Sequence, residues 1–418
     1  MATQTSKQVR RRRVFYIPGY DPIHPRRYRE LYRKEGRAQA DISGYEIGLK
    51  PKTGKGNYGW HVTAQMQGQA TQADIDVLVW SDIVRDSMSN SIPATYGQLL
   101  RTAWTYAASG ALWRLMRMRK GPVIAALYPV GMLLTQLVLA LLAGWLVARG
   151  IGAAGGVLAK AVAPWIGPLV VMAQIGGGLA LAVFALRWFK ARDGKLYAYY
   201  LMHDFAYSAR WNGANAPELE ARMARFGDEI AEALNSDVDE VLVVGHSSGA
   251  HLSVSILADL IRAGRVPADG PALGFLSLGQ VVPMVSFLPD AYRLRADLQF
   301  LSARDELAWV DVTAPGDGCA FALCDPVAVS GVAPQDKRWP LVISAAFTQT
   351  LSEARWKELR WRFFRLHFQY LCAFDRVGDY DYFRITAGPV TLAERFSGRA
   401  PSKSRIAKPV SKYTSVAA

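Results

Sequence analysis

Cysteine is scarce in this sequence of 418 residues, which contains only Cys319, Cys324 and Cys372. Three cysteines cannot all pair, and none has the C-x-x-C spacing of a redox or zinc motif. A disulfide scaffold therefore does not fit, and a reducing compartment such as the cytosol is expected. The N-terminus also lacks the long apolar run of a signal peptide, because its basic residues pass directly into the short segment 14–17. Export through the N-terminus is not expected.

Internal repeats and a phosphate-binding loop are also lacking. Gly54-Lys55-Gly56 has neither the required spacing nor a following helix. The net charge of +14 is unevenly placed, since the predicted tails 1–12 and 397–418, with Arg13, carry ten of the positive charges and no acidic residue. Such tails either stay solvated or are attracted to an anionic lipid surface. Nucleic acid is not an expected partner.

Two long segments have no charged residue, Val123–Ala148 and Ala161–Leu186. Each exceeds the ~20 residues that a helix needs to cross a bilayer. We therefore predict a transmembrane hairpin within residues 101–195, with the Gly-rich segment 149–160 as its short connection. A pair of buried core helices, or a hairpin that dips into one leaflet, is the alternative.

Positive charges flank this hairpin more than they occupy its connection. Arg149 and Lys160 lie in the connection, and the flanking residues are Arg114, Arg117, Arg119, Lys120, Arg187, Lys190, Arg192 and Lys195. The positive-inside rule then places both ends of the hairpin, and the remainder of the chain, in the cytoplasm.

The remainder of the chain, 13–100 and 196–396, alternates strand-like and helix-like patterns. Short apolar segments at 14–17, 75–84, 241–244, 273–278 and 307–313 predict buried strands, and the helical patterns are 25–37, 218–234, 250–261 and 289–301. Residues 43–50 and 58–66 predict a hairpin around the loop 51–57. This order predicts an α/β fold with a mostly parallel sheet covered by helices on both faces.

One strand ends in the G-x-S-x-G sequence Gly245-His246-Ser247-Ser248-Gly249, and a helical pattern follows. This context is typical of a nucleophile elbow, in which a serine stands exposed on a tight turn beside a general base. Gly245 and Gly249 are expected where a side chain would collide with the adjoining strand or helix. A tight turn without chemistry is the alternative.

A serine nucleophile needs a histidine base, and the base needs an acid. His251 is one helical turn from Ser247 and can hardly reach its hydroxyl, which leaves His367 as the later histidine in the chain. His367 lies in 352–370, which looks continuously helical. Asp317 follows a predicted strand on a Gly-flanked turn and is the preferred acid. Asp311, Asp325 and Asp305 are the alternatives.

Near the N-terminus, the strand 14–17 ends at Pro18-Gly19-Tyr20. A backbone N–H of this loop is placed to join that of Ser248 as a donor to an oxyanion. His24 lies in the same loop, either lining the pocket or exposed at the surface.

Together Gly19-Tyr20, the elbow, Asp317 and His367 resemble the α/β-hydrolase superfamily of serine esterases, lipases and thioesterases. The resemblance implies the chain order Ser, acid, His, with Tyr20 and Ser248 forming the oxyanion hole. We expect a membrane-anchored serine hydrolase of esters or thioesters with an apolar acyl group, which needs no metal or organic cofactor. A lipid or other acyl ester is the expected substrate, and the lipid bilayer is the expected partner. An acyltransferase with the same residues, or an inactive membrane-tethered scaffold, is the alternative.

Overall fold

The structure is a computed structural model that describes residues 8–54, 56–88, 91–161 and 164–418. Lys7 and Lys55, which entered the sequence predictions, lie outside these residues, as do residues 162–163 of the second apolar segment. The chain forms two compact units. The sheet unit comprises residues 1–86, 105–123 and 208–418, and the helical unit comprises 87–104 and 124–207.

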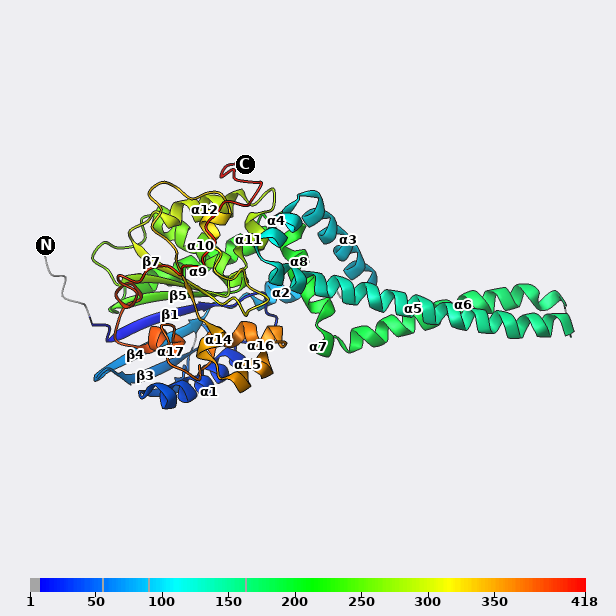
Figure 1. The fold of residues 1–418 in the computed structure, drawn as a ribbon, viewed down its shortest axis with the longest axis horizontal. Helices are drawn as coiled ribbons and strands as arrows, with labels where there is room; N and C mark the ends of the chain where they lie inside the picture. The colour runs from blue at the N-terminus through cyan, green and yellow to red at the C-terminus, as the bar shows by residue number, and fades with distance from the viewer. Residues whose placement is uncertain (1–7, 55, 89–90, 162–163) are drawn as a thin grey trace. The chain divides into compact units, whose positions relative to one another are not determined.

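An eight-stranded mixed sheet forms the centre of the sheet unit (Figure 1). Its order is β2-β3-β4-β1-β5-β6-β7-β8. The strands are β1 (Arg11–Ile17), β2 (Glu46–Pro51), β3 (Gly59–Met66), β4 (Gln69–Val77), β5 (Glu240–His246), β6 (Ala272–Leu278), β7 (Leu307–Thr313) and β8 (Leu341–Ser344). The strands β2, β3 and β4 pair antiparallel, and all other neighbours are parallel. The predicted α/β class is thus confirmed.

Burial follows from each strand's place in the sheet. All seven residues of β5 and of β7 are buried, as expected for parallel strands covered on both faces. Strand β3 alternates buried and exposed residues, which is the pattern of an antiparallel strand with one solvated face.

Helices cover both faces of this sheet (Figure 1). On one side lie α9 (Pro217–Leu234), α10 (Ser248–Arg262) and α12 (Tyr292–Ser302). On the other lie α1 (Arg26–Ser43) and α17 (Tyr382–Ala387), where Tyr32 of α1 packs its ring 5.6 Å from Trp60 of β3 and 4.9 Å from Phe383 of α17. The remaining helices of this unit are α2 (Ser81–Ser87), α4 (Ala111–Met118), α11 (Val282–Ser286), α13 (Pro326–Val329), α14 (Phe347–Thr350), α15 (Glu353–Leu359), α16 (Phe363–His367), η2 (Phe368–Leu371) and α18 (Leu392–Arg395).

The parallel strands bring several loops to one edge of the sheet. The loops after β1, β4, β5, β6 and β7 all leave from the carboxyl ends of strands that run in parallel. In α/β sheets this edge is where ligands bind.

The two predicted basic tails are partly integrated into the sheet unit. Residues 11 and 12 belong to β1, and Arg12 is buried with its Nε 2.5 Å from Glu240 of β5. Near the C-terminus, Ile406 forms an isolated β-bridge with Cys324, and the Val410 N–H donates to the Val329 carbonyl at 3.0 Å. The expectation of simple solvated tails is therefore wrong for these residues, because their backbone and buried charges find partners in the fold.

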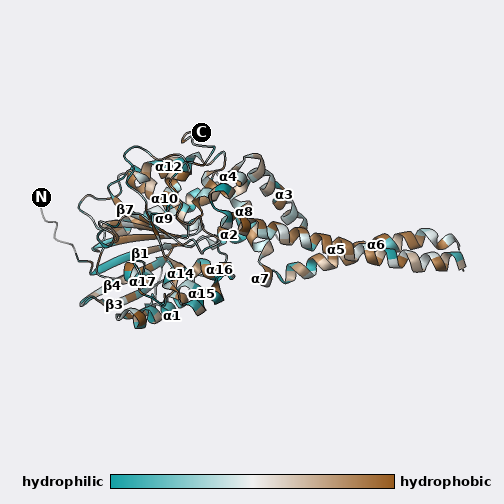
Figure 2. Cartoon of the chain, viewed as in Figure 1, coloured by the Kyte–Doolittle hydropathy of each residue, from teal (hydrophilic) through white to brown (hydrophobic). Residues whose placement is uncertain are grey.

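The helical unit contains the two apolar segments as an antiparallel pair, α5 (Lys120–Ala161) and α6 (Gly167–Ala191) (Figure 2). Its other helices are η1 (Pro164–Ile166), α7 (Asp193–Leu196), α8 (Ala198–Arg210) and α3 (Ile92–Ala108), which begins in this unit. The predicted connection 149–160 is not a loop but the last part of α5. Glycines explain the difference, because Gly144 and Gly178 bring the two backbones together and a Cβ on Gly155 would lie 2.5 Å from Val170.

Two other segments differ from the sequence prediction. The strand expected at 75–84 ends as β4 at Val77, and α2 begins at Ser81. The continuous helix expected at 352–370 is divided into α15, α16 and η2, because Arg362 leaves the helical conformation with φ −101° and ψ 67°. This break matters for the site, since it redirects the segment that carries His367.

Candidate active site

Ser247 occupies a strained turn between β5 and α10. Its φ of 56° and ψ of −122° are a conformation that only glycine adopts easily. The strain costs on the order of 1–3 kcal/mol, so the surrounding structure must hold it. One such contact is the Ser247 N–H, which donates to the Leu278 carbonyl at the end of β6 at 2.9 Å. The side chain is partly exposed, unlike its neighbours.

The two motif glycines give this turn the room it needs. A Cβ on Gly245 would lie 2.7 Å from the Cα of Ala250 in α10. A Cβ on Gly249 would lie only 2.0 Å from the carbonyl oxygen of Ile17, the last residue of β1. The expected collisions with helix and strand are confirmed, and they explain why both positions require glycine.

The loop after β1 reaches the same turn. A Cβ on Gly19 would lie 2.9 Å from Cβ and 3.3 Å from Oγ of Ser247. Trp80 fixes this loop, because its indole N–H donates to the Pro18 carbonyl at 2.9 Å and its ring meets that of Tyr20 edge-on at 6.1 Å. Tyr20 is the residue after Gly19, so its backbone N–H belongs to the same loop beside Ser247.

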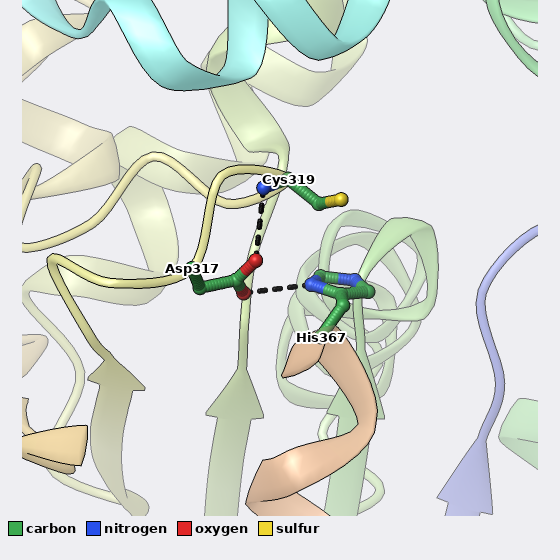
Figure 3. A group of neighbouring side chains, drawn as sticks. All are labelled: Asp317, Cys319 and His367. Atoms are coloured by element: carbon green, nitrogen blue, oxygen red, sulfur yellow. Dashed lines mark hydrogen bonds and ion pairs between the residues drawn. The ribbon is translucent and has the colours of Figure 1, made fainter. Parts of the chain in front are cut away.

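Asp317 and His367 come together at the same edge (Figure 3). The Nδ1–H of His367 donates to Oδ2 of Asp317 at 2.7 Å, and both side chains are buried. Two further donors hold the carboxylate: the Tyr370 hydroxyl reaches Oδ2 at 3.0 Å, and the Cys319 N–H reaches Oδ1 at 2.8 Å. The Tyr370 oxygen in turn accepts the Ala314 N–H at 3.0 Å. Burial raises the pKa of Tyr370 well above its usual value, so it remains a donor to Asp317.

His367 borders the turn that holds Ser247. A Cβ on Gly279 would lie 2.9 Å from Cε1 of His367, and the preceding residue, Leu278, accepts the Ser247 N–H. Within the described part of the chain, Nε2 of His367 is buried and has no hydrogen-bond partner. A basic nitrogen in that state is available for a proton from a nearby hydroxyl or from a bound molecule.

His246 is a second histidine of the site. Its Nε2 lies 3.1 Å from the carbonyl oxygen of His367, and the two rings are 4.8 Å apart. Burial, followed by the repulsion of His367, lowers the pKa of His246 well below its usual value. His246 is therefore neutral at pH 7, with its proton on Nε2 to donate to that carbonyl. The Tyr16 hydroxyl, 3.4 Å from Nδ1, completes the arrangement.

The alternative acids contact other groups. Asp311 accepts from the Ser277 hydroxyl at 2.6 Å within the sheet, and burial raises its pKa to about 8. Asp325 caps α13 and pairs with Lys337 at 2.7 Å, whereas Asp305 pairs with Arg338. Of the four candidates, Asp317 is the one hydrogen-bonded to His367.

The two remaining candidate histidines do not join this group. His251 is buried in α10, where burial lowers its pKa to about 4. His24 is exposed, and its Nδ1 accepts the Arg26 N–H at 3.2 Å. The surface alternative for His24 is therefore the correct one.

The sequence prediction missed Tyr370 and Trp80, and it assigned His246 only to the turn. Tyr370 lies three residues after His367, a spacing at which a second polar group shares a helical face, so this signal was present in the sequence. No signal in the sequence pointed to Trp80, because its hydrogen bond to Pro18 depends on β4 and β1 being neighbours in the sheet.

A metal ion also has possible ligands here. One ligand atom from each of Asp317, Cys319 and His367 lies within 4.8 Å of the other two (Figure 3). Carboxylate, thiolate and imidazole are the ligands that zinc prefers.

The described elements define an α/β protein with a mixed sheet and with a serine and an Asp–His pair at the carboxyl edge of the parallel strands. The chain matches no protein-family model, no curated protein and no solved structure.

Proposed function

We propose that this protein is a membrane-associated serine hydrolase that cleaves an ester or thioester with an apolar acyl group. The observation that carries the proposal is the Asp317–His367 hydrogen bond of 2.7 Å, whose imidazole leaves Nε2 buried and unpartnered next to the turn that bears Ser247. This is the arrangement that serine activation requires, because the acid fixes the tautomer that leaves Nε2 as the acceptor.

In the proposed reaction Ser247 Oγ attacks the carbonyl carbon of the substrate while His367 Nε2 takes its proton. The backbone N–H groups of Tyr20 and Ser248 stabilise the negative charge that develops on the carbonyl oxygen. Ser248 is suited to this role because it is the first residue of α10, where the N–H groups have no partner within the helix. His367 then protonates the leaving group, and water releases the acyl group by the reverse route.

The helical unit supports a membrane location. α5 and α6 are long and apolar enough to cross a membrane. Core helices of soluble proteins are mostly buried, but only 22% of the apolar window of α5 and 11% of that of α6 is buried within the chain. Large apolar side chains such as Trp145, Val157, Ile175 and Phe184 are exposed. Exposed apolar surface of this extent favours a lipid environment.

A contact within the sheet unit favours a lipid substrate. The first residues of α5, which belong to this unit, lie against the loop that carries Asp317. A Cβ on Gly121 would be 3.5 Å from the Cα of Gly318, and Arg119 Nε donates to the Ala322 carbonyl at 2.8 Å. The acid of the proposed triad therefore lies beside the first residues of an apolar helix.

The packing of α5 against α6 shows how deep Arg149 would lie if the hairpin crossed the bilayer. Arg149 lies between Gly144, which contacts Gly178, and Gly152, which contacts Gln174, so it is level with the middle of α6. Helix α6 is about 37 Å long, enough to cross the ~30 Å hydrocarbon core. A full span of α6 would place Arg149 inside the bilayer, at a cost of about 2.5–3.5 kcal/mol. The guanidinium of Arg149 lies over the Trp145 ring, 5.7 Å from its centroid.

The orientation is tested by cysteine labelling in intact cells. We expect a Lys160→Cys variant to react with a membrane-impermeant maleimide from outside, because the hairpin tip crosses the bilayer while both hairpin ends stay in the cytoplasm. Cys319 and Cys372, in the sheet unit, serve as internal controls that react only after lysis. Labelling of Lys160→Cys only after lysis would show that the hairpin dips into one leaflet.

A fluorophosphonate probe tests the chemistry. The full-length protein in detergent is expected to be labelled, and Ser247→Ala to lose the label. Ser253→Ala, six residues further along in α10, is the matched control. The Ser253 hydroxyl donates to the Gly249 carbonyl within the same helix, so it is not the expected nucleophile. Label that persists in Ser247→Ala would refute the proposal. Label without hydrolysis of water-soluble esters would indicate an acyltransferase that excludes water from the acyl-enzyme.

A further inference from the structure

We infer that Asp317, Cys319 and His367 form a reversible zinc site that inhibits the proposed hydrolase. The inhibition rests on the proposed function, whereas zinc binding does not. The three side chains provide a carboxylate, a thiol and an imidazole, with one ligand atom of each within 4.8 Å of the other two (Figure 3). Three protein ligands with an open fourth position is the usual arrangement at zinc sites that bind a water or substrate molecule.

The His367 ring can move its proton away from this cluster. His367 is 6% exposed, yet its Nε2 has no hydrogen-bond partner in the part of the chain that the structure describes. This nitrogen lies on the far side of the ring from Asp317, so it can carry the ring proton when a metal ion shared with Asp317 binds Nδ1. Cys319 is half-buried, so the cluster is open to solvent on the cysteine side.

The required movement is small. Zinc bonds of ~2.0–2.3 Å in a tetrahedron place ligand atoms roughly 3.5 Å apart, so the largest separation must shrink by about 1 Å. Cys319 and Asp317 lie on one loop with their backbones already linked, because the Cys319 N–H donates to Asp317 Oδ1. Rotation of the cysteine side chain can supply much of that movement without unfolding the loop.

The charges balance when zinc binds. The Cys319 thiol gives up its proton, and a thiolate and a carboxylate then neutralise the two charges of Zn²⁺. The nitrogen of His367 that faces Asp317 is Nδ1, so an ion shared with Asp317 binds there. Zinc on Nδ1 replaces the proton shared with Asp317, so the ring proton moves to Nε2 and the base is lost.

The site is tested by zinc binding to the full-length protein in detergent, measured by competition with a fluorescent zinc chelator. Loss of an outer-shell partner of a zinc ligand weakens affinity about 10–100-fold, so Cys319→Ala should weaken zinc binding at least that much. Cys372→Ala is the matched control, since this thiol lies five residues beyond His367 outside the cluster and should leave zinc binding within twofold. Ser247→Ala should also bind zinc normally, because Ser247 is not a ligand.

The inhibitory effect is measured separately, as the rate of fluorophosphonate labelling with and without zinc. Wild type should slow at least tenfold at saturating zinc, and Cys319→Ala should change less than twofold at that concentration. Equal zinc affinity of Cys319→Ala and wild type would overturn the site, and so would unchanged labelling of zinc-saturated wild type. Zinc binding that depends on Cys319 in a protein that never labels would support the site and reject the serine hydrolase.

Discussion

Replacing Asp317 by Asn gives the sharpest test of the proposed triad. Both oxygens of the carboxylate accept hydrogen bonds, Oδ2 from His367 Nδ1 at 2.7 Å and Tyr370 at 3.0 Å, and Oδ1 from the Cys319 N–H at 2.8 Å. An asparagine has one acceptor and one donor end. In either orientation its NH₂ group faces a hydrogen-bond donor, so at least one of these interactions is lost.

The lower-cost orientation keeps the Cys319 contact and points the NH₂ group at His367 and Tyr370. His367 then places its proton on Nε2 to accept from the amide through Nδ1, and it can no longer take the proton of Ser247. Wrong-tautomer substitutions of this kind lower rates about 10³–10⁴-fold, which corresponds to about 4–5.5 kcal/mol of transition-state stabilisation.

The assay is the second-order rate of fluorophosphonate labelling of the full-length protein at pH 7. Asp311→Asn is the matched control, because the pKa of about 8 keeps Asp311 largely protonated at pH 7 and an amide is close to it in shape and charge. We expect this control to label within about threefold of wild type, since buried isosteric changes that keep the charge are tolerated best. If Asp317→Asn labels within tenfold of wild type while Asp311→Asn does not label, the acid has been assigned wrongly.

Three further predictions concern packing and stability. Gly19→Ala should slow labelling about 10–100-fold, because its Cβ would lie 2.9 Å from Cβ and 3.3 Å from Oγ of Ser247 and would displace the serine; an unchanged rate would exclude a role for this close approach. Arg12→Ala should destabilise the protein by about 3–5 kcal/mol in chemical denaturation, since it leaves Glu240 buried and unpaired. The exposed Arg11→Ala should cost less than about 1 kcal/mol, and equal losses would contradict this. His251 has a lowered folded pKa of about 4, so the unfolded state takes up its proton first as the pH falls below about 6.5, and stability declines. His251→Leu should therefore gain about 2 kcal/mol relative to wild type between pH 7 and pH 5 in denaturation curves, and parallel pH profiles would refute it.

Local sequence patterns were enough to predict those features whose stabilising interactions join residues close together in the chain. The turn at Ser247 follows from a β-branched strand, two glycines and a helical pattern within 13 residues, and the structure places β5, the turn and α10 there. The apolar composition of α5 and α6 was equally clear, because hydropathy sums over neighbouring residues.

Long-range contacts decided the rest. The glycines of 149–160 suggested a loop, yet the same residues allow close packing on α6, and this packing outweighs the low helix propensity of glycine. The break at Arg362 could not be predicted from apolar spacing. It depends on the contacts of His367 and Tyr370 with Asp317, which lies in a loop some fifty residues earlier in the chain.

The sequence by itself determined the strands β1, β5, β6 and β7 at the centre of the sheet, which segments are apolar enough for a membrane, and which serine stands on a tight turn, whereas it predicted neither β8 nor the bounds of β4. Only the tertiary structure decided that Asp317, rather than Asp311, Asp325 or Asp305, meets His367, that Tyr370 holds that acid, and that Arg12 is a buried ion pair instead of part of a tail. The physical reason is that a hydrogen bond between buried groups depends on strand order and loop direction, and neither quantity is encoded in residues that are neighbours along the chain.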